Sequence, residues 1–350
     1  MRAGDPLAAG DGYEGDGCSA MEQILPRRTP GTHLLVEPHV TPLTRAFVVV
    51  VTATVALGAV VGPARAEEPD PDPVRGIVLP PLDAVVGLLP PVPVPAKPYT
   101  GDVCVDGADA CIDDVIGRME ERLDRLTRSC AHSAIFSLAY LRVTENVRDA
   151  VRSGYFADRA WLNRVDAVFA ELYFDVRDDW HAGRRDRIPK AWEIALDTED
   201  KRRMTGLGNF MLAMNAHINR DFPHVLAEVG LTAPDGTSHK RDHDAYNQRL
   251  DSLYAPVFAE EAARFDPRFD DIDVSTIEET LAGVIMRGWR EMVWRHAELL
   301  TFARTPAARR AVEQQIEMYA ASQAMLMKEI FRSSRGGTAQ RDAYCAAHHG

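Results

Sequence analysis

The chain has 350 residues, of which 46% are hydrophobic and 26% charged, and its formal net charge is −12 at pH 7. A negative chain offers no positive field for nonspecific electrostatic binding, so neither nucleic acid nor an anionic lipid surface is expected as a partner. A small cationic ligand or a metal ion is not disfavoured by this charge.

An uncharged apolar run follows Arg45 and extends over residues 46–61. A basic flank, a short apolar run and the small residues that end at Ala66 are the parts of a secretory signal, with cleavage expected after Ala66. The run is shorter than the roughly 20 apolar residues of a membrane span. We therefore assign residues 1–66 to an export signal with a long N-terminal extension and expect a secreted or cell-envelope protein, with a retained membrane anchor as the alternative.

Proline dominates the segment that follows, with ten prolines between Glu67 and Pro98. Such a composition favours an extended, polyproline-type spacer over a packed domain, so residues 67–99 are predicted to be a Pro-rich linker. A spacer behind an export signal would hold a folded domain away from a cell wall or membrane. A disordered leader without that role is the alternative.

The chain contains five cysteines, and removal of the export signal would take Cys18 and leave an even number. Cys104, Cys111, Cys130 and Cys345 are then disulfide candidates in an oxidising compartment, with three pairings open. Cys104 and Cys111 could close a small loop, which would leave Cys130 and Cys345 to join the C-terminal tail to an early helix. No C-x-x-C occurs, which argues against a thiolate zinc site or thioredoxin-like chemistry.

Apolar residues recur at helical spacing from about Thr100 onward. Asp158, Ser275 and Thr305 have the composition of helix N-caps. The expected helices cover, in chain order, about residues 112–126, 134–152, 158–176, a short helix from 189, 199–222, a short helix at 223–230, 244–265, 275–304 and 306–333. A polar loop is expected at residues 231–243.

No run combines strand alternation with hairpin turns, and no fixed-period repeat occurs. The predicted fold is therefore all-α, a single multi-helix bundle with non-parallel helices over residues 100–335. A flexible C-terminal tail is expected at residues 336–350. A domain of about 230 residues can bury a substantial core.

The stretch from Gly206 to His224 carries polar residues inside the most apolar run of the second half of the chain. On a helix, His217 and Asp221 share one face because they are four residues apart, and Asn215 and Asn219 form a second pair of this kind. Unpaired polar groups in a core cost kcal/mol each, so a buried imidazole and carboxylate require an explanation.

One explanation is a metal site, with zinc as the expected ion, because His-x-x-x-Asp places two ligands at a spacing suited to a single cation. His224 would add a third ligand, although Pro223 makes a continuous helix doubtful. His296 and Asp166 are the candidates from other helices. The side chains of Asn215 and Asn219 would orient the metal-binding side chains without binding the metal themselves.

The alternative is structural. Asp221 would be the N-cap of the helix that begins at Pro223, and His217 would be a core histidine bonded to a carbonyl group or to Asp221. His239 and His243 are also four residues apart, but their charged surroundings predict a solvated segment.

Several catalytic signatures are absent, namely G-x-S-x-G, a P-loop and H-E-x-x-H. Gly206-Leu207-Gly208 follows no predicted strand, so a dinucleotide fold is excluded and no nucleotide cofactor is expected.

Three blocks carry a family resemblance, namely L-A-Y-L-R-V-T-E-N-V, V-D-A-V-F-A-E-L-Y and N-A-H-I-N-R-D-F-P. In this order they resemble an actinobacterial, often exported helical family of unknown function, over roughly Gly117 to Phe331. The resemblance implies an all-α domain and no assigned activity.

A second likeness concerns one motif. H-I-N-R-D-F-P-H resembles the zinc-binding helix of zinc-dependent phospholipases C and fungal zinc nucleases, which implies that His217, Asp221 and His224 bind zinc. Those enzymes also use an N-terminal Trp and a second His-x-x-x-Asp/Glu, whereas this mature chain would begin at Glu67 and His296 has no carboxylate four residues on. The likeness therefore implies a mononuclear or dinuclear site.

Two functional hypotheses follow. The first is an exported zinc-dependent hydrolase acting on phosphoesters, in which the metal activates a water molecule. The second is a non-catalytic cell-envelope or interaction protein whose buried His/Asp/Asn cluster only fixes helix packing.

Overall fold

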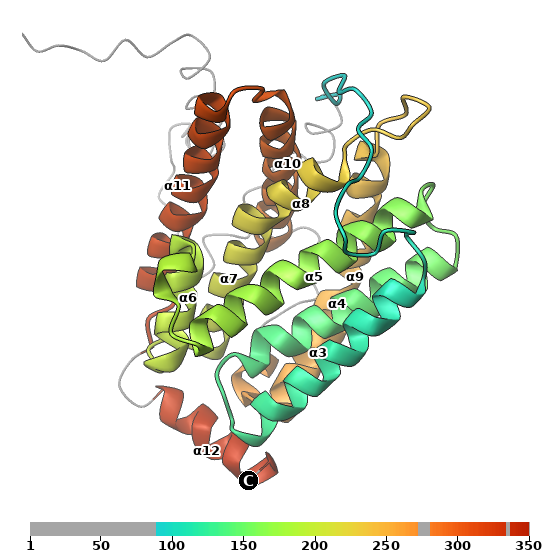
Figure 1. Ribbon diagram of the computed structural model, residues 1–350. Helices are drawn as coiled ribbons and strands as arrows, with labels where there is room; N and C mark the ends of the chain where they lie inside the picture. The colour runs from blue at the N-terminus through green and yellow to red at the C-terminus, as the bar shows by residue number, and fades with distance from the viewer. Residues whose placement is uncertain (1–88, 272–280, 334–336, 350) are drawn as a thin grey trace, which may run out of the picture. The chain divides into compact units, whose positions relative to one another are not determined.

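The computed structural model describes residues 89–271, 281–333 and 337–349 (Figure 1). Within these ranges every regular element is a helix and no strand forms, which confirms the all-α prediction. None of the described helices is long and apolar enough to cross a membrane. The expected export signal, most of the Pro-rich linker and the expected Ser275 cap lie outside the described residues.

The helices follow the predicted order closely. They are α3 (Ala110–Arg128), α4 (Ala134–Arg152), α5 (Arg159–His181), η1 (Arg185–Arg187), α6 (Lys190–Asp200), α7 (Gly206–Asn215), η2 (Ala216–Asp221), α8 (Phe222–Val229), α9 (Lys240–Arg264), η3 (Pro267–Asp271), α10 (Leu281–Phe302), α11 (Pro306–Ile330) and α12 (Gly337–His349). Two predicted caps are confirmed, since the side chain of Asp158 accepts from the Trp161 N–H and that of Thr305 from the Ala308 N–H.

The expected single helix over residues 199–222 is wrong. The chain leaves α6 after Asp200, restarts α7 with Thr205 as N-cap, and widens into a π-helical turn over η2 before α8. Pro223 explains the widening, because it has no N–H to donate to the preceding turn and its ring crowds that turn. His217 and Asp221 therefore lie in the π-helical turn.

The expected polar loop at residues 231–243 is also partly wrong, because α9 begins at Lys240. His239 and His243 are buried. The ring of His239 stacks on Trp161 with 4.4 Å between centroids, and the ammonium of Lys240 pairs with Glu291 at 2.7 Å. Charged residues are buried here because partners from distant helices satisfy them.

The helices are not parallel, as predicted. In Figure 1, α3, α4 and α5 run side by side at a slant, whereas α10 and α11 stand steeply at the other side. The segment formed by α7, η2 and α8 lies between them, where it contacts α4 and α5 on one side and α10 and α11 on the other. This central placement buries the polar residues of η2.

Glycines permit two close approaches at the start of α7. A Cβ atom on Gly206 would lie 2.6 Å from the Asp266 carboxylate, and one on Gly208 would lie 2.7 Å from Cβ of Phe331. The glycine pair in Gly206-Leu207-Gly208 therefore serves helix packing.

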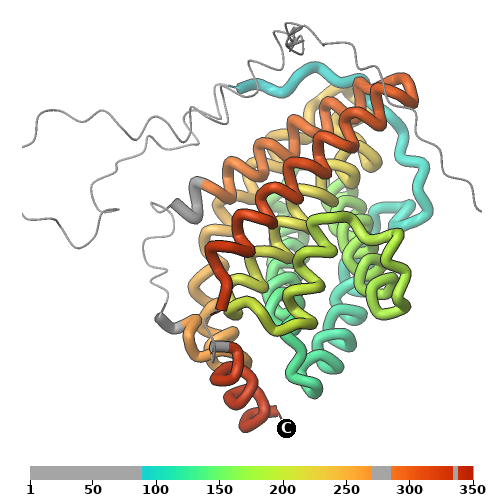
Figure 2. Tube along the Cα trace, turned by 90° about the vertical axis from the view of Figure 1, so that its left-hand side faces the viewer, coloured from blue at the N-terminus to red at the C-terminus, as the bar shows by residue number. Residues whose placement is uncertain are grey.

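Both disulfides follow the pairing that the sequence left open, Cys104 with Cys111 and Cys130 with Cys345. The second bond fixes α12, so the residues expected as a flexible tail form a helix beside the C-terminal end of α9 (Figures 1 and 2).

The last residues of the Pro-rich linker belong to the folded unit. The N–H of Val92 donates to Glu298 at 2.8 Å, and Val94 is buried. Residues 89–92 therefore lie against α10, and the Val94 carbonyl accepts from the Thr232 hydroxyl at 2.7 Å, contacts that the linker composition alone does not predict.

Candidate functional site: an apolar cavity beside the central segment

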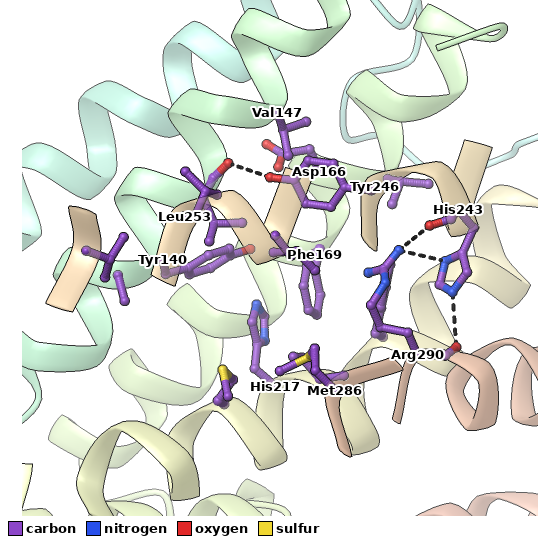
Figure 3. A pocket seen from close by; sticks show the side chains of 18 of the residues that line it. Tyr140, Val147, Asp166, Phe169, His217, His243, Tyr246, Leu253, Met286 and Arg290 are labelled. Carbon is purple, nitrogen blue, oxygen red and sulfur yellow. Dashed lines mark hydrogen bonds between the residues drawn. The ribbon is translucent and has the colours of Figure 1, made fainter. Parts of the chain in front are cut away.

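A cavity of about 140 Å³ lies among α4, α5, α9, α10 and the central segment (Figure 3). Its wall is mainly apolar and aromatic and includes Phe136, Val165, Phe169, Leu253 and Met286. Pockets that bind small molecules have this character, with a few polar groups placed among apolar walls. The polar atoms of the wall therefore decide what the cavity can do.

Asp221 holds His217 in one orientation. Oδ2 of Asp221 lies 3.2 Å from Nδ1 of His217 and also accepts from Nε1 of Trp192 at 2.7 Å, while Oδ1 accepts from Arg220 at 2.9 Å. Burial alone would raise the pKa of Asp221, but the hydrogen bond from His217 and the charge of Arg220 outweigh it and hold the pKa below its usual value. Because an ionised carboxylate only accepts, Nδ1 of His217 carries the proton.

His217 is consequently a neutral imidazole with a lone pair on Nε2. Burial lowers its pKa more than Asp221 raises it. The ring lies parallel to Phe169 with 3.6 Å between centroids and meets the ring of Tyr140 at 4.6 Å. Nε2 has no hydrogen-bond partner among the described residues.

Two further polar atoms of residues that line the cavity lack partners within the described part of the chain, Oδ2 of Asp166 and the hydroxyl of Tyr140, whose ring lies against the imidazole. Burial raises the pKa of Asp166 to about 7. Burial and then the charge of Asp166 raise the pKa of Tyr140 well above its usual value. The wall thus offers a hydroxyl donor, a carboxyl group that titrates near neutrality and an imidazole acceptor, and Figure 3 shows His217 pointing toward the ring of Tyr140.

The structure brings some of the predicted site residues together and separates others. His217 and Asp221 form the predicted pair, and Asp166 lines the same cavity as His217. His224 and His296 do not line the cavity; burial lowers the pKa of each to about 4, and the charge of His224 contributes to the shift of His296. His224 faces a separate polar groove with Arg220 and the start of α11.

Asn215 and Asn219 face α11. Nδ2 of Asn215 donates to the Ala320 carbonyl at 2.9 Å, and Nδ2 of Asn219 donates to Oδ1 of Asn215 at 2.9 Å. Within the described residues neither amide bonds to His217 or Asp221. They join the central segment to α11.

Within the described residues, no three of the predicted ligands lie together. Among the described residues, the only three side chains of ligand type whose donor atoms lie within 4.8 Å of one another are Cys104, Asp106 and Cys111. Two of these are joined in a disulfide. The zinc prediction therefore depends on the sequence pattern and on the unpartnered Nε2 of His217.

Sequence reasoning missed Tyr140 and Arg290 as site residues. Tyr140 lies in the mainly apolar first half of α4, residues 134–141, and has no distinguishing neighbour there. Arg290 had a usable signal, since it stands four residues after Met286 and four before Trp294 and thus on the apolar stripe of α10.

In the described residues, the fold and the cavity define a class: a helical, disulfide-linked protein with an apolar pocket and buried titratable groups in its wall. Residues 112–330 match the family of unknown function DUF5995, and the chain belongs to this family. Neither a curated protein nor a solved structure matches the chain. The predicted membership of a helical family of unknown function is confirmed; the actinobacterial origin and the likeness to zinc enzymes stay predictions.

Proposed function

We propose that this protein binds a small, mainly apolar molecule in the cavity, with one polar group of the ligand against Tyr140, Asp166 and His217. The observation that carries the proposal is the set of three buried polar atoms without partners beside an apolar space. Each such atom costs about 1–3 kcal/mol, and native proteins keep few of them. A hydroxyl or carbonyl group of a ligand would satisfy these atoms.

The volume limits the ligand. A dry engineered cavity of about 150 Å³ holds benzene, and this cavity has about 140 Å³. One ring or a short branched chain therefore fits. The donor, the titrating carboxyl and the imidazole acceptor also equip the site to move a proton on such a molecule, with Nε2 of His217 as the base.

Toluene and p-cresol test the proposal, since they differ by one hydroxyl group. We expect calorimetry to detect both, with p-cresol bound more tightly. Tyr140→Phe should reduce the preference for p-cresol. Tyr173→Phe is the matched control, because the Tyr173 hydroxyl bonds to Ser137 at 2.6 Å and does not line the cavity. Absence of binding by both probes at millimolar concentration would refute the proposal.

The zinc-dependent hydrolase remains a second proposal. It is supported by the H-I-N-R-D-F-P-H likeness and by the neutral imidazole of His217, whose Nε2 has no partner among the described residues. The test is zinc content by mass spectrometry of the purified chain beside His217→Ala, with the exposed His348→Ala as control. One or two zinc ions lost only in His217→Ala would favour it, and a metal-free wild type after zinc loading would reject it.

The structural alternative, a non-catalytic envelope or interaction protein, is supported by the bonds of Asn215 and Asn219 to α11. It predicts that variants of the His217–Asp221 pair lose stability while no ligand or metal is ever bound. The two binding experiments above therefore decide between it and the other proposals.

Export is part of the proposal as well. Two disulfides support an oxidising compartment, because such bonds rarely persist in a reducing cytosol. N-terminal sequencing of the protein recovered from the producing cells tests it. A mature start at Glu67 is expected, and an intact segment 46–66 would favour the retained anchor.

A further inference from the structure

Arg290 is a buried guanidinium on the wall of the same cavity, only 6% exposed. Its Nε donates to Oδ1 of Asn247 at 2.6 Å, and its Nη2 donates to the His243 carbonyl. The rings of Phe222 and Tyr246 each lie 5.8 Å from its Cζ. Nη1 has no hydrogen-bond partner among the described residues, and Figure 3 shows the guanidinium beside Phe169 with His243 on its other side.

No carboxylate of the described residues bonds to this guanidinium. The other α10 arginines near it have such partners: Arg287 pairs with Asp251 at 3.1 Å, and Arg295 pairs with Glu291 and Glu298. Arg290 is therefore the exception on its own helix, although it is as deeply buried as Arg287.

The acidic groups around Arg290 are engaged elsewhere or remote. Asp244 raises its pKa but is bound by Lys240 at 2.7 Å. Asp242 accepts two backbone N–H groups, at 3.0 and 2.8 Å. Asp166 also lines the cavity, but among the described residues no hydrogen bond or ion pair joins it to Arg290.

A buried charge to which no carboxylate bonds directly is costly. Burial does lower the pKa of Arg290, but only to about 10, so the group stays charged at neutral pH. Guanidinium groups bind carboxylates through charge-assisted N–H···O bonds, and Nη1 is the nitrogen of Arg290 that can donate such a bond to a ligand.

We propose that the ligand of this cavity is a carboxylic acid, a small aromatic or branched aliphatic monoanion whose carboxylate lies against Nη1 of Arg290. The apolar walls take the ring or chain. This inference rests on the proposed ligand-binding function and adds a charged group at Arg290 to the polar group that faces Tyr140, Asp166 and His217.

Benzoate and benzamide provide the test, because they have the same shape and differ in charge. Calorimetry on the full, disulfide-bonded chain is done at about pH 6, where benzoate is ionised and Asp166, with its pKa of about 7, is mostly protonated. We expect benzoate to bind at least about tenfold more tightly than benzamide, the effect of one charge-assisted hydrogen bond. Arg290→Gln should remove this preference.

Arg287→Gln is the matched control. It removes a buried guanidinium from the same helix that does not line the cavity, and it should keep the preference for benzoate. Equal affinities for the two probes in the wild type, or an equal loss in both variants, would overturn the inference. If toluene or benzamide still binds, the proposed function survives; if no probe binds, both fail. Should Arg290→Gln not fold, the comparison of probes on the wild type decides alone.

Discussion

Nε1 of Trp192 donates to Oδ2 of Asp221 over 2.7 Å, and Nδ1 of His217 lies 3.2 Å from the same oxygen. One carboxylate oxygen therefore joins α6 to the π-helical turn and also orients the imidazole beside the cavity. The other oxygen accepts a hydrogen bond from Arg220, which also pairs with Glu317 of α11 at 3.4 Å. Asp221 is the centre of a network that links three parts of the fold.

Replacing Asp221 by alanine should lower the free energy of unfolding by about 3–5 kcal/mol, because it leaves Trp192, His217 and Arg220 without their shared acceptor in a buried place. Urea denaturation followed by circular dichroism measures the change. Asp178→Ala is the control, since the Asp178 carboxylate bonds to Arg122 but is half exposed; about 1 kcal/mol or less is expected there. Equal losses in both variants would contradict the role given to Asp221.

Asp166 should make stability depend on pH. Its folded-state pKa of about 7 lies above the ordinary carboxyl value, so its stabilising contribution is complete below about pH 4 and is lost as pH rises toward 7. The side chain of the Asp166→Asn variant cannot ionise. Its free energy of unfolding should therefore exceed that of the wild type increasingly over this range, by roughly 4 kcal/mol as an upper limit.

Denaturation curves of both proteins from about pH 4 to pH 8 measure this gain. Glu261 is wholly buried, and burial raises its pKa as well. It also makes stability fall as pH rises, but it is present in both proteins. The difference between the two curves therefore reports Asp166 alone. Parallel curves would show that the folded-state pKa of Asp166 is ordinary.

Gly208 and Gly117 should respond to alanine in opposite directions. A Cβ on Gly208 would meet Cβ of Phe331 at 2.7 Å, so Gly208→Ala should cost about 1–3 kcal/mol through overpacking. Nothing lies within 4 Å of a Cβ on Gly117 in α3. Gly117→Ala should therefore raise the free energy of unfolding by about 0.4–1 kcal/mol, because alanine has the higher helix propensity and lowers the entropy of the unfolded chain. Thermal unfolding gives the sign of each change, and two changes of the same sign would refute the packing assigned to Gly208.

The two disulfides should differ in their contribution to stability. Cys130 and Cys345 are 215 residues apart and Cys104 and Cys111 only 7, and the entropy removed from the unfolded chain grows with the length of the closed loop. Loss of the long-range bond should cost about 2–5 kcal/mol, and loss of the short one less. Paired Cys→Ala variants of each bond allow the comparison in urea. The reverse order would show that the bonds act mainly on the folded state.

The local parts of the fold followed from the sequence. Helix positions came from apolar spacing and caps, and the 134–152 prediction agrees with α4 at both ends. The pairing of His217 with Asp221 followed from their spacing. Pro223 indicated an irregularity and accounts for the π-helical turn, but the burial of that turn depends on packing against α10 and α11, which local spacing does not contain.

The cavity could not be predicted, because its wall combines side chains from helices far apart in the chain. The same reason explains the buried charges of α9: Lys240 appears solvated in its own segment and is buried only because Glu291 of α10 meets it. Arg290 shows the opposite case, a charge buried without a carboxylate among the described residues. Tertiary partners, or their absence, decide such positions.

The bond between Cys130 and Cys345 cannot form until synthesis of the chain is almost complete. Cys130 is synthesised long before Cys345, so until the chain is almost complete Cys130 has no correct partner and stays a free thiol or forms a bond that must later be exchanged. The nearby cysteines Cys104 and Cys111 are available first, which makes mispairing the characteristic early error. Correct pairing of the four cysteines therefore requires either that the chain folds before its thiols are oxidised or that an early wrong disulfide is exchanged.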